Sequence, residues 1–528
     1  MLYPISNYYR QVAHLSGMWE IRFDPDDEGR EAGWAAGFEG GQPIAVPASW
    51  NEQISAAHDY SSAAWVQLKF DRPWGWADQR CYLRFDAVSY RAEVWLNGVA
   101  MGEHEGGYLP FEFDVMHYLA PVDNILVVRV EGPPDGFDTC GIQRPVLIYT
   151  RPHGSIRNLT VEVGLDGPTG LVRAVMERTP GEPVTARFVL SGYGIELVEQ
   201  ARSDEQFTEA NFSVPDAELW APGEPNRYQL DVELLGDEGI YDTYSLPVGI
   251  RSVAVDGDHL LLNGEPILLR GFSHRDDFPV LGAGLTPAAV VMDFEVLQSL
   301  GANALLTGGS PVAEEMIRMA DRLGIPVIAG APRVPLIGKE GVERRRTLAE
   351  DFVCEMIDRD RNHPSVIMWS VTGEPELMLP SPKPLIEKAK ELDPTRPVTL
   401  SSGRGVREDA FAFCDVICVS HDTVQSDVDL ADTLDQVYAE FGKPVIVSVE
   451  GAESIAGLHA DPPEPLSEEM QADLLIDAIE VMESRPFVAG QFAGMLCDTW
   501  GDRSGALTRD RRPKLAGHRV GERWRDKG

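Results

Sequence analysis

Apolar and polar residues alternate in short runs over the first part of the chain. The runs include Cys81-Tyr-Leu-Arg-Phe85 and Asn124-Ile-Leu-Val-Val-Arg-Val130, and turn-forming residues separate them. Alternation with a period of two is typical of strands that bury one face. The pair Asn97-Gly98, flanked by apolar residues, predicts a tight hairpin. We therefore expect residues 1–152 to form a jelly-roll β-sandwich.

The same alternation continues through residues 153–250. It is seen in Ala186-Arg-Phe-Val-Leu190 and in Tyr228-Gln-Leu-Asp-Val-Glu-Leu234. A stretch of about 100 residues with this pattern is typical of an immunoglobulin-like β-sandwich. The Cys–Trp–Cys spacing of antibody domains is absent. The second prediction therefore depends on the alternation alone.

From residue 251 onward, apolar runs of strand length alternate with amphipathic helical stretches. The apolar runs begin at Pro266, Ala302, Ile325, Val366, Pro397, Val416, Pro444 and Phe487. Helices are expected between several of these runs, at 287–300, 312–323, 344–359 and 467–483. A repeated βα pattern of this length predicts a TIM (β/α)8 barrel over residues 251–528, whereas a doubly wound sheet would carry a Gly-rich phosphate loop after its first strand. The expected fold class is thus a multidomain β and α/β protein.

Reactive groups of TIM barrels lie at the carboxyl ends of the strands, and this tells us where to look for a site. Polar residues follow five of the predicted strands. They are Asp276, Asp277, Glu374, His421, Asp422, Glu450, Glu453, Asp498 and Arg503.

Composition and charge narrow the possible partners. The chain carries 84 acidic and 46 basic side chains, a formal charge of −38, so we expect neither nucleic acid nor a membrane surface as partner. The six cysteines show no metal-ligand spacing, and no cofactor or metal is expected. The N-terminus lacks a signal-peptide pattern, which predicts a cytoplasmic protein. The partner that we expect is a small-molecule substrate. The sequence leaves open whether the chain forms a homo-oligomer.

Several longer segments are specific enough to compare with known families. They are Tyr90-Arg-Ala-Glu-Val-Trp-Leu-Asn-Gly98, Gly141-Ile-Gln-Arg-Pro-Val146, Leu219-Trp-Ala-Pro-Gly-Glu-Pro225, Leu262-Asn-Gly-Glu-Pro-Ile267 and Arg361-Asn-His-Pro-Ser-Val-Ile-Met-Trp-Ser370. With these segments the chain resembles glycoside hydrolase family 2, particularly its β-glucuronidase and β-galactosidase branches, over nearly its whole length. The resemblance implies a sugar-binding-like jelly roll, a middle sandwich and a catalytic barrel.

The resemblance also implies two catalytic carboxylates about 5 Å apart, one an acid/base and the other a nucleophile. The family's acid/base lies in an Asn-Glu-Pro segment after the fourth strand, which here reads Gly373-Glu374-Pro375. Glu374 is thereby implied as the acid/base. Gly373 replaces an Asn that holds the 2-hydroxyl of the sugar.

The nucleophile segment of the family corresponds to Ser448-Val449-Glu450-Gly451. When the segments are aligned from Lys443-Pro444 without gaps, the resemblance places Val449 at the nucleophile position. Glu450 is then the residue that follows that position. Because side chains alternate across a strand, we expect this shift to turn the carboxylate to the other face. A local bulge would restore its direction.

Other positions that bind the sugar in the family are also altered. The residues now there are Leu306-Thr-Gly-Gly-Ser-Pro311, Ala329-Gly330 and Gly494-Met495, and the motif that grips a uronate carboxylate reads Asp502-Arg503-Ser504. These changes predict a wider and more apolar pocket. The candidates for substrate binding are Trp369, Asp498 and Arg503, together with Gly373.

A lone carboxyl in an apolar pocket is suited to proton transfer near neutral pH. We therefore expect Glu374 to catalyse dehydration or elimination on a natural-product intermediate, with Asp277 or His421 as second proton carrier. This resembles family 2-like proteins of polyketide and tetramate antibiotic pathways. Two alternatives stay open. One is a β-glycosidase in which Glu450 is a displaced nucleophile, and the other is a non-catalytic carbohydrate-binding protein.

Overall fold

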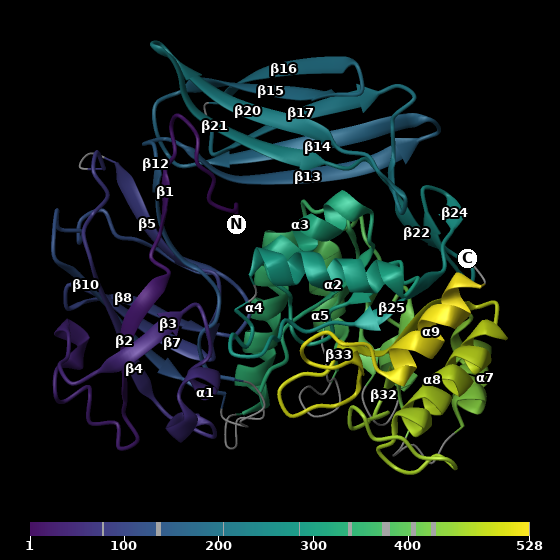
Figure 1. Cartoon of the computed structure of the whole chain (residues 1–528). Helices are drawn as coiled ribbons and strands as arrows, with labels where there is room; N and C mark the ends of the chain where they lie inside the picture. The colour runs from purple at the N-terminus through teal and green to yellow at the C-terminus, as the bar shows by residue number, and fades with distance from the viewer. Residues whose placement is uncertain are drawn as a thin grey trace.

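The computed structural model has three domains in chain order, two β-sandwiches and a barrel surrounded by helices (Figure 1). The predicted fold class is confirmed. The first sandwich lies beside the barrel, and the second lies across the top of both in Figure 1. The described residues are 1–76, 79–133, 139–203, 205–284, 286–335, 341–371, 381–402, 408–423 and 429–526.

The first domain packs two antiparallel sheets against each other, with strand orders β3-β2-β4-β10-β7-β8 and β1-β12-β5-β9. The predicted hairpin forms between β7 and β8, where Asn97 and Gly98 both have positive φ. A short helix, α1 (Trp50–Gln53), follows β3. The strands are β1 (Val12–His14), β2 (Gly17–Phe23), β3 (Gln42–Val46), β4 (Ala64–Phe70), β5 (Arg80–Phe85), β6 (Val88–Ser89), β7 (Arg91–Leu96), β8 (Val99–Glu105), β9 (Phe111–Asp114), β10 (Asn124–Glu131), β11 (Gly141–Ile142) and β12 (Val146–Arg151).

The second domain is also a two-sheet sandwich, with strand orders β13-β14-β17 and β16-β15-β20-β21. Its core is formed by the alternate residues of these strands, as the sequence pattern predicts. The strands are β13 (Ile156–Asp166), β14 (Thr169–Arg178), β15 (Val184–Gly192), β16 (Ile195–Ser203), β17 (Phe207–Val214), β20 (Tyr228–Gly236) and β21 (Gly239–Val248). Two short ribbons join it to the barrel: β18 (Trp220–Ala221) with β19 (Glu224–Pro225), and the sheet of β22 (Val253–Asp256), β23 (His259–Leu262) and β24 (Glu265–Pro266).

The third domain is a parallel barrel whose strands match the eight apolar runs. The fifth position is divided at Leu400 into β29 and β30, which pair with opposite neighbours and so close the ring. The strands are β25 (Leu269–Ser273), β26 (Ala304–Leu306), β27 (Val327–Gly330), β28 (Val366–Ser370), β29 (Val398–Thr399), β30 (Ser401–Ser402), β31 (Ile417–Asp422), β32 (Val445–Glu450) and β33 (Val488–Cys497), with β34 (Gly505–Leu507) beside β33. The helices are α2 (Pro287–Ser299), α3 (Glu314–Leu323), α4 (Val342–Asp360), α5 (Lys383–Leu392), α6 (Glu408–Phe411), α7 (Leu430–Phe441), α8 (Glu468–Glu483) and α9 (Leu515–Arg525).

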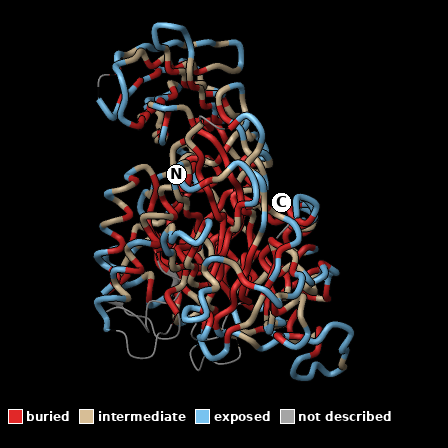
Figure 2. The backbone as a smooth tube through the Cα atoms, turned by 90° about the vertical axis from the view of Figure 1, so that its left-hand side faces the viewer, coloured by how far each residue is buried: buried red, intermediate tan, exposed pale blue. Residues whose placement is uncertain are grey.

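Two separate apolar clusters distinguish the inside of the barrel from its outside. Leu269, Ile328 and Phe492 belong to a cluster formed by strands and the hairpin that closes one end. Phe272 and Trp524 belong to a larger cluster that joins the strands to the surrounding helices. Figure 2 shows that the buried backbone, coloured red, is concentrated in the interior of the molecule. Along β31 and β32 neighbouring residues alternate between the two clusters, so in these strands membership indicates which way a residue faces.

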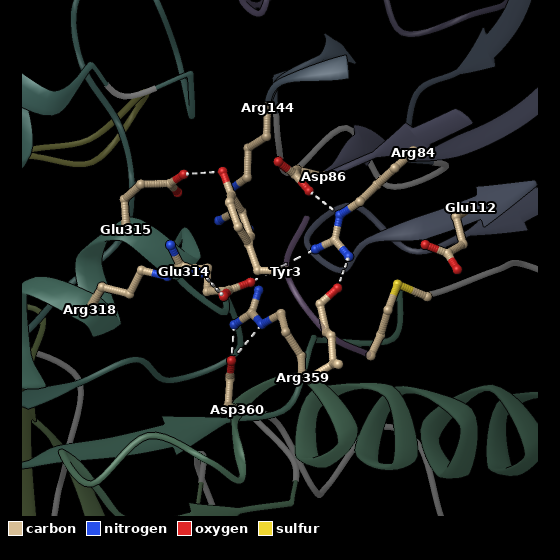
Figure 3. A network of polar contacts seen from close by, with 12 residues as sticks. Tyr3, Arg84, Asp86, Glu112, Arg144, Glu314, Glu315, Arg318, Arg359 and Asp360 are labelled. Carbon is tan, nitrogen blue, oxygen red and sulfur yellow. Dashed lines mark hydrogen bonds and ion pairs between the residues drawn. The ribbon is translucent and has the colours of Figure 1, made fainter. Parts of the chain in front are cut away.

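A buried ionic network holds the first domain against the barrel (Figure 3). Arg84 donates to Asp86 at 2.6 Å and lies 3.8 Å from Glu314 at the start of α3. Tyr3 donates to Glu315 at 3.0 Å, and burial raises the pKa of this phenol. Charges removed from water cost free energy unless they are paired, so the network fixes how the domains meet. In the described residues, no helix is both long and apolar enough to cross a membrane.

Candidate active site

Strand β32 presents Glu450 at the carboxyl end of the barrel. Val445, Val447 and Val449 belong to the outer cluster between strands and helices, whereas Ile446 belongs to the inner cluster. The Ser448 hydroxyl lies 3.2 Å from the Ser273 hydroxyl across the interior. Because side chains alternate along a strand, Glu450 shares the inner face with Ile446 and Ser448. It is the last residue of the strand and is exposed, at the barrel mouth.

This orientation corrects the expectation that Glu450 is turned away from the site. Val449 is only 1% exposed and belongs to the outer cluster. Alternation along β32 sets the direction of each side chain. The distance of a residue from Lys443-Pro444 in an alignment does not. The sequence does indicate this direction. Ser448 and Glu450 are two residues apart and so share one face of the strand, whereas Val445, Val447 and Val449 share the other.

The neighbouring strand β31 places Asp422, rather than His421, beside Glu450. Asp422 and Glu450 are direct partners in the parallel ladder, and His421 pairs with Val449. Cys418 belongs to the inner cluster and Val419 to the outer one, so Asp422 faces the mouth and His421 faces the helices. Burial lowers the pKa of His421. The role of His421 as a proton carrier at the mouth therefore has no geometric support.

Backbone contacts fix the ends of these two strands. The amide and hydroxyl of Thr423 both donate to the carbonyl of Glu450, at 3.0 and 3.1 Å. Gly451 has φ +78°, and a Cβ at this position would collide with the Asp422 carboxylate. Only a glycine has both the conformational freedom and the space that this turn requires. The backbones that carry Asp422 and Glu450 are thus joined directly.

Asp277, after strand β25, is neutralised by a neighbouring arginine. Its carboxylate accepts hydrogen bonds from the Arg509 guanidinium and from the backbone amide of Trp500. Arg509 also pairs with Glu52 in α1 of the first domain. Asp277 is 5% exposed. The structure therefore shows Asp277 as a charge that joins two domains at the rim of the mouth.

Asp498 and Arg503 lie after strand β33 and are organised by a lysine that sequence analysis missed. Lys514 is 1% exposed, and its ammonium donates to the Asp498 carboxylate at 2.8 Å and to the Arg503 carbonyl at 2.9 Å. Burial raises the pKa of Asp498, and the charge of Lys514 opposes that effect. The Arg503 side chain is exposed. Asp498 is thus engaged in structure, whereas Arg503 is accessible.

Trp369 does not line the mouth. It is fully buried in the outer cluster, and its indole donates to Asp393 at 3.0 Å. The ring packs between the barrel and its helices, so the expectation of substrate contact is wrong for geometric reasons. Gly373 and Glu374 lie outside the described residues.

A cleft of about 420 Å³ opens at the opposite end of the barrel. It lies between the β22–β24 sheet and the end of α8, and its lining includes Ile267, Arg270, Met482 and Gln491. Arg270 and a further lining residue, Val488, lie at the amino ends of β25 and β33, where TIM barrels do not carry their reactive groups. We therefore place the candidate site at the other end, around Glu450.

Comparison with known proteins agrees with this architecture. Residues 12–152 match the family model described as glycosyl hydrolases family 2, sugar binding domain, residues 155–251 match glycosyl hydrolases family 2, and residues 253–524 match the TIM barrel domain of that family. The chain belongs to glycoside hydrolase family 2.

Individual members of glycoside hydrolase family 2 match over the whole length. The chain is 32% identical to a β-glucuronidase from Paenibacillus borealis, covering 100% of this chain and 99% of that protein. It is 33% identical to the β-glucuronidase of the dog, Canis lupus familiaris, and the match covers 99% of this chain and 92% of that protein. A β-glucuronidase from Ruminococcus gnavus in complex with D-glucuronic acid superposes with a TM-score of 0.90 at 30% identity, over 99% of both chains.

These relatives overturn the expected dehydration chemistry. The interpretation as a lyase of a polyketide or tetramate pathway assumed that the attacking carboxylate had been lost. The full-length relatives are β-glucuronidases, and alternation along β32 turns the Glu450 carboxylate toward the mouth. The findings support the glycosidase alternative instead.

Proposed function

We propose that this protein hydrolyses β-D-glucuronides with retention of configuration. The observation that carries the proposal is the inward-facing position of Glu450 at the end of β32, in a chain that is similar over its full length to β-glucuronidases. Retaining glycosidases need one carboxylate that attacks the anomeric carbon and one that protonates the leaving oxygen. We assign the first role to Glu450 and the second to Glu374.

The reaction follows in two balanced steps. Glu450 attacks the anomeric carbon while the Glu374 carboxylic acid gives its proton to the departing oxygen, which leaves a glycosyl ester on Glu450 and a free alcohol. Glu374, now ionised, then takes a proton from water as the water cleaves the ester. Asp422 is proposed as a positioning residue for Glu450, because the two are ladder partners on one face.

Arg503 is the proposed partner of the uronate carboxylate. Its side chain is exposed, and its carbonyl is held by the Lys514 ammonium and by the Ser454 amide at 2.9 and 3.2 Å. A guanidinium on a fixed backbone can bind a carboxylate through two parallel hydrogen bonds. This assignment makes the substrate an acidic sugar rather than a neutral one.

We also propose that the protein works in a reducing compartment. None of the six cysteines forms a disulfide, and five of them are buried. Burial raises the pKa of the Cys81 thiol to about 11 and that of Cys414 to about 12, so both stay protonated and unreactive at neutral pH. These features support the cytoplasm as the location of the protein.

Hydrolysis of 4-nitrophenyl β-D-glucuronide by the purified full chain tests this function. We expect turnover in the wild type, a loss of about 10⁴-fold or more in Glu450→Gln, and weak activity toward the corresponding β-galactoside. Arg503→Ala should raise KM for the glucuronide without affecting that for the galactoside. Binding of glucuronide without any hydrolysis would instead support a non-catalytic carbohydrate-binding protein.

A further inference from the structure

An aromatic pair bridges two domains at the rim of the barrel mouth. His58, from the first domain, and Trp500, after strand β33, have ring centroids 4.5 Å apart with planes tilted by 46°. The Arg509 guanidinium lies over the same indole, 5.5 Å from its centroid. His58 is exposed and Trp500 is half-buried, so the pair has accessible surface.

The rim that carries this pair is fixed from both sides. The Trp500 amide donates to Asp277, and Arg509 connects Asp277 to Glu52 in α1. The loop after β25 packs against the same segment, because the amide of Val280 donates to Glu52 at 3.3 Å. An anchored backbone loses little conformational freedom when a ligand binds. The arrangement is therefore preorganised to receive a planar group.

The position of Trp500 relates it to the reaction proposed above. In the barrel, β33 lies between β25 and β32. Trp500 lies three residues beyond the end of β33, and Glu450 is the last residue of β32. Trp500 and Glu450 therefore lie at the same end of the barrel, at the carboxyl ends of neighbouring strands.

We infer that Trp500 and His58 form a binding subsite for an aromatic, planar aglycone of the glucuronide, which rests on the proposed function. A flat apolar ring gains free energy by stacking on an indole, and the tilted imidazole offers a second surface. The first domain thereby contributes directly to substrate selection. Trp500 and His58 act on specificity and take no part in bond breaking.

Two glucuronides that differ only in their aglycone test the subsite. In Trp500→Ala and in His58→Ala, kcat/KM for 4-methylumbelliferyl β-D-glucuronide should fall about fivefold to tenfold. Hydrolysis of methyl β-D-glucuronide should stay within about twofold of the wild type. Trp500→Phe should keep most of the activity. Trp74→Ala is the matched control, since Trp74 is 98% exposed on the first domain. This substitution should leave kcat/KM unchanged for both glucuronides.

Equal losses on both glucuronides, or no loss on either, would overturn the subsite while leaving the proposed function intact. If the wild type hydrolyses neither, calorimetric titration of the intact protein with the 4-methylumbelliferyl glucuronide separates the two proposals. Binding that weakens in Trp500→Ala would then support the subsite without the function. Absence of binding to the wild type would overturn both.

Discussion

Asp422 and Glu450 are direct partners in the parallel ladder between β31 and β32, and both face the mouth of the barrel. Adjacent strands lie about 4.8 Å apart, so partner side chains on one face are close neighbours. Their backbones are joined through Thr423, whose amide and hydroxyl both bind the Glu450 carbonyl. The direction of Glu450 is therefore determined by the strand pair, and this direction supports its proposed role as the attacking carboxylate.

Replacing residues on opposite faces of β31 should have unequal effects. Asp422→Asn should lower kcat/KM for an aryl β-glucuronide by about tenfold or more, because it changes the immediate neighbour of Glu450. His421→Gln should stay within about threefold of the wild type, because this side chain faces the helices. Steady-state kinetics of the two variants provide the measurement. A larger loss of kcat/KM in His421→Gln than in Asp422→Asn would contradict the side-chain directions described for β31.

Gly451 should be more sensitive to alanine substitution than another glycine of similar conformation. Gly451→Ala introduces a Cβ that meets the Asp422 carboxylate, whereas Gly457, with φ +82°, has open space around it. Both substitutions place alanine at positive φ, which costs about 1–2 kcal/mol. Only Gly451→Ala should in addition lower activity by displacing Asp422. The comparison requires melting temperatures and kcat/KM for both variants, and equal activities would count against the proposed contact.

Arg509 should stabilise the junction between the first domain and the barrel. Arg509→Gln leaves the carboxylates of Asp277 and Glu52, whose side chains are 7% and 11% exposed, without their cation. The expected loss is about 1–3 kcal/mol in the free energy of unfolding. Arg512→Gln serves as control, because Arg512 is 81% exposed and exposed ion pairs contribute little. Thermal unfolding monitored by calorimetry would show no difference between the variants if the bridge is unimportant.

The pair of His363 and Asp321 should give stability a pH dependence on the alkaline side. Burial acts to lower the pKa of His363, but the charge of Asp321, whose carboxylate lies 2.6 Å from Nδ1, raises it above 6.5 overall. A raised pKa contributes stability that is fully present below pH 6.5 and is lost as pH rises through the folded pKa. Melting temperatures of the wild type should therefore fall more steeply above pH 6.5 than those of His363→Gln. Parallel curves would contradict this assignment.

Local patterns were sufficient to predict the fold. The apolar runs that begin at Val366 and Pro444 became β28 and β32, and the stretch 287–300 became α2, because burial in a parallel sheet and helical periodicity both leave continuous signals in the sequence. Alternation likewise predicted the sandwiches. These features depend on neighbours in the chain and are therefore readable from it.

The site could be predicted only in part, for two different reasons. Asp277 and Arg503 were identified as polar residues at strand ends, but their partners Arg509 and Lys514 were not, since Arg509 lies 232 residues from Asp277 and no local pattern connects them. The facing of Glu450 was misjudged because residues were counted against relatives instead of being compared with Val445, Val447 and Ser448 of its own strand.

Covalent trapping of the nucleophile tests the central claim most directly. The intact protein would be incubated with a 2-deoxy-2-fluoro-β-D-glucuronosyl fluoride, and the labelled peptide identified by mass spectrometry after proteolysis. We predict one sugar per chain, attached to Glu450, and no labelling in Glu450→Gln. A label on another carboxylate, or an unlabelled protein that nevertheless hydrolyses aryl β-glucuronides, would contradict the assignment of Glu450 as the nucleophile.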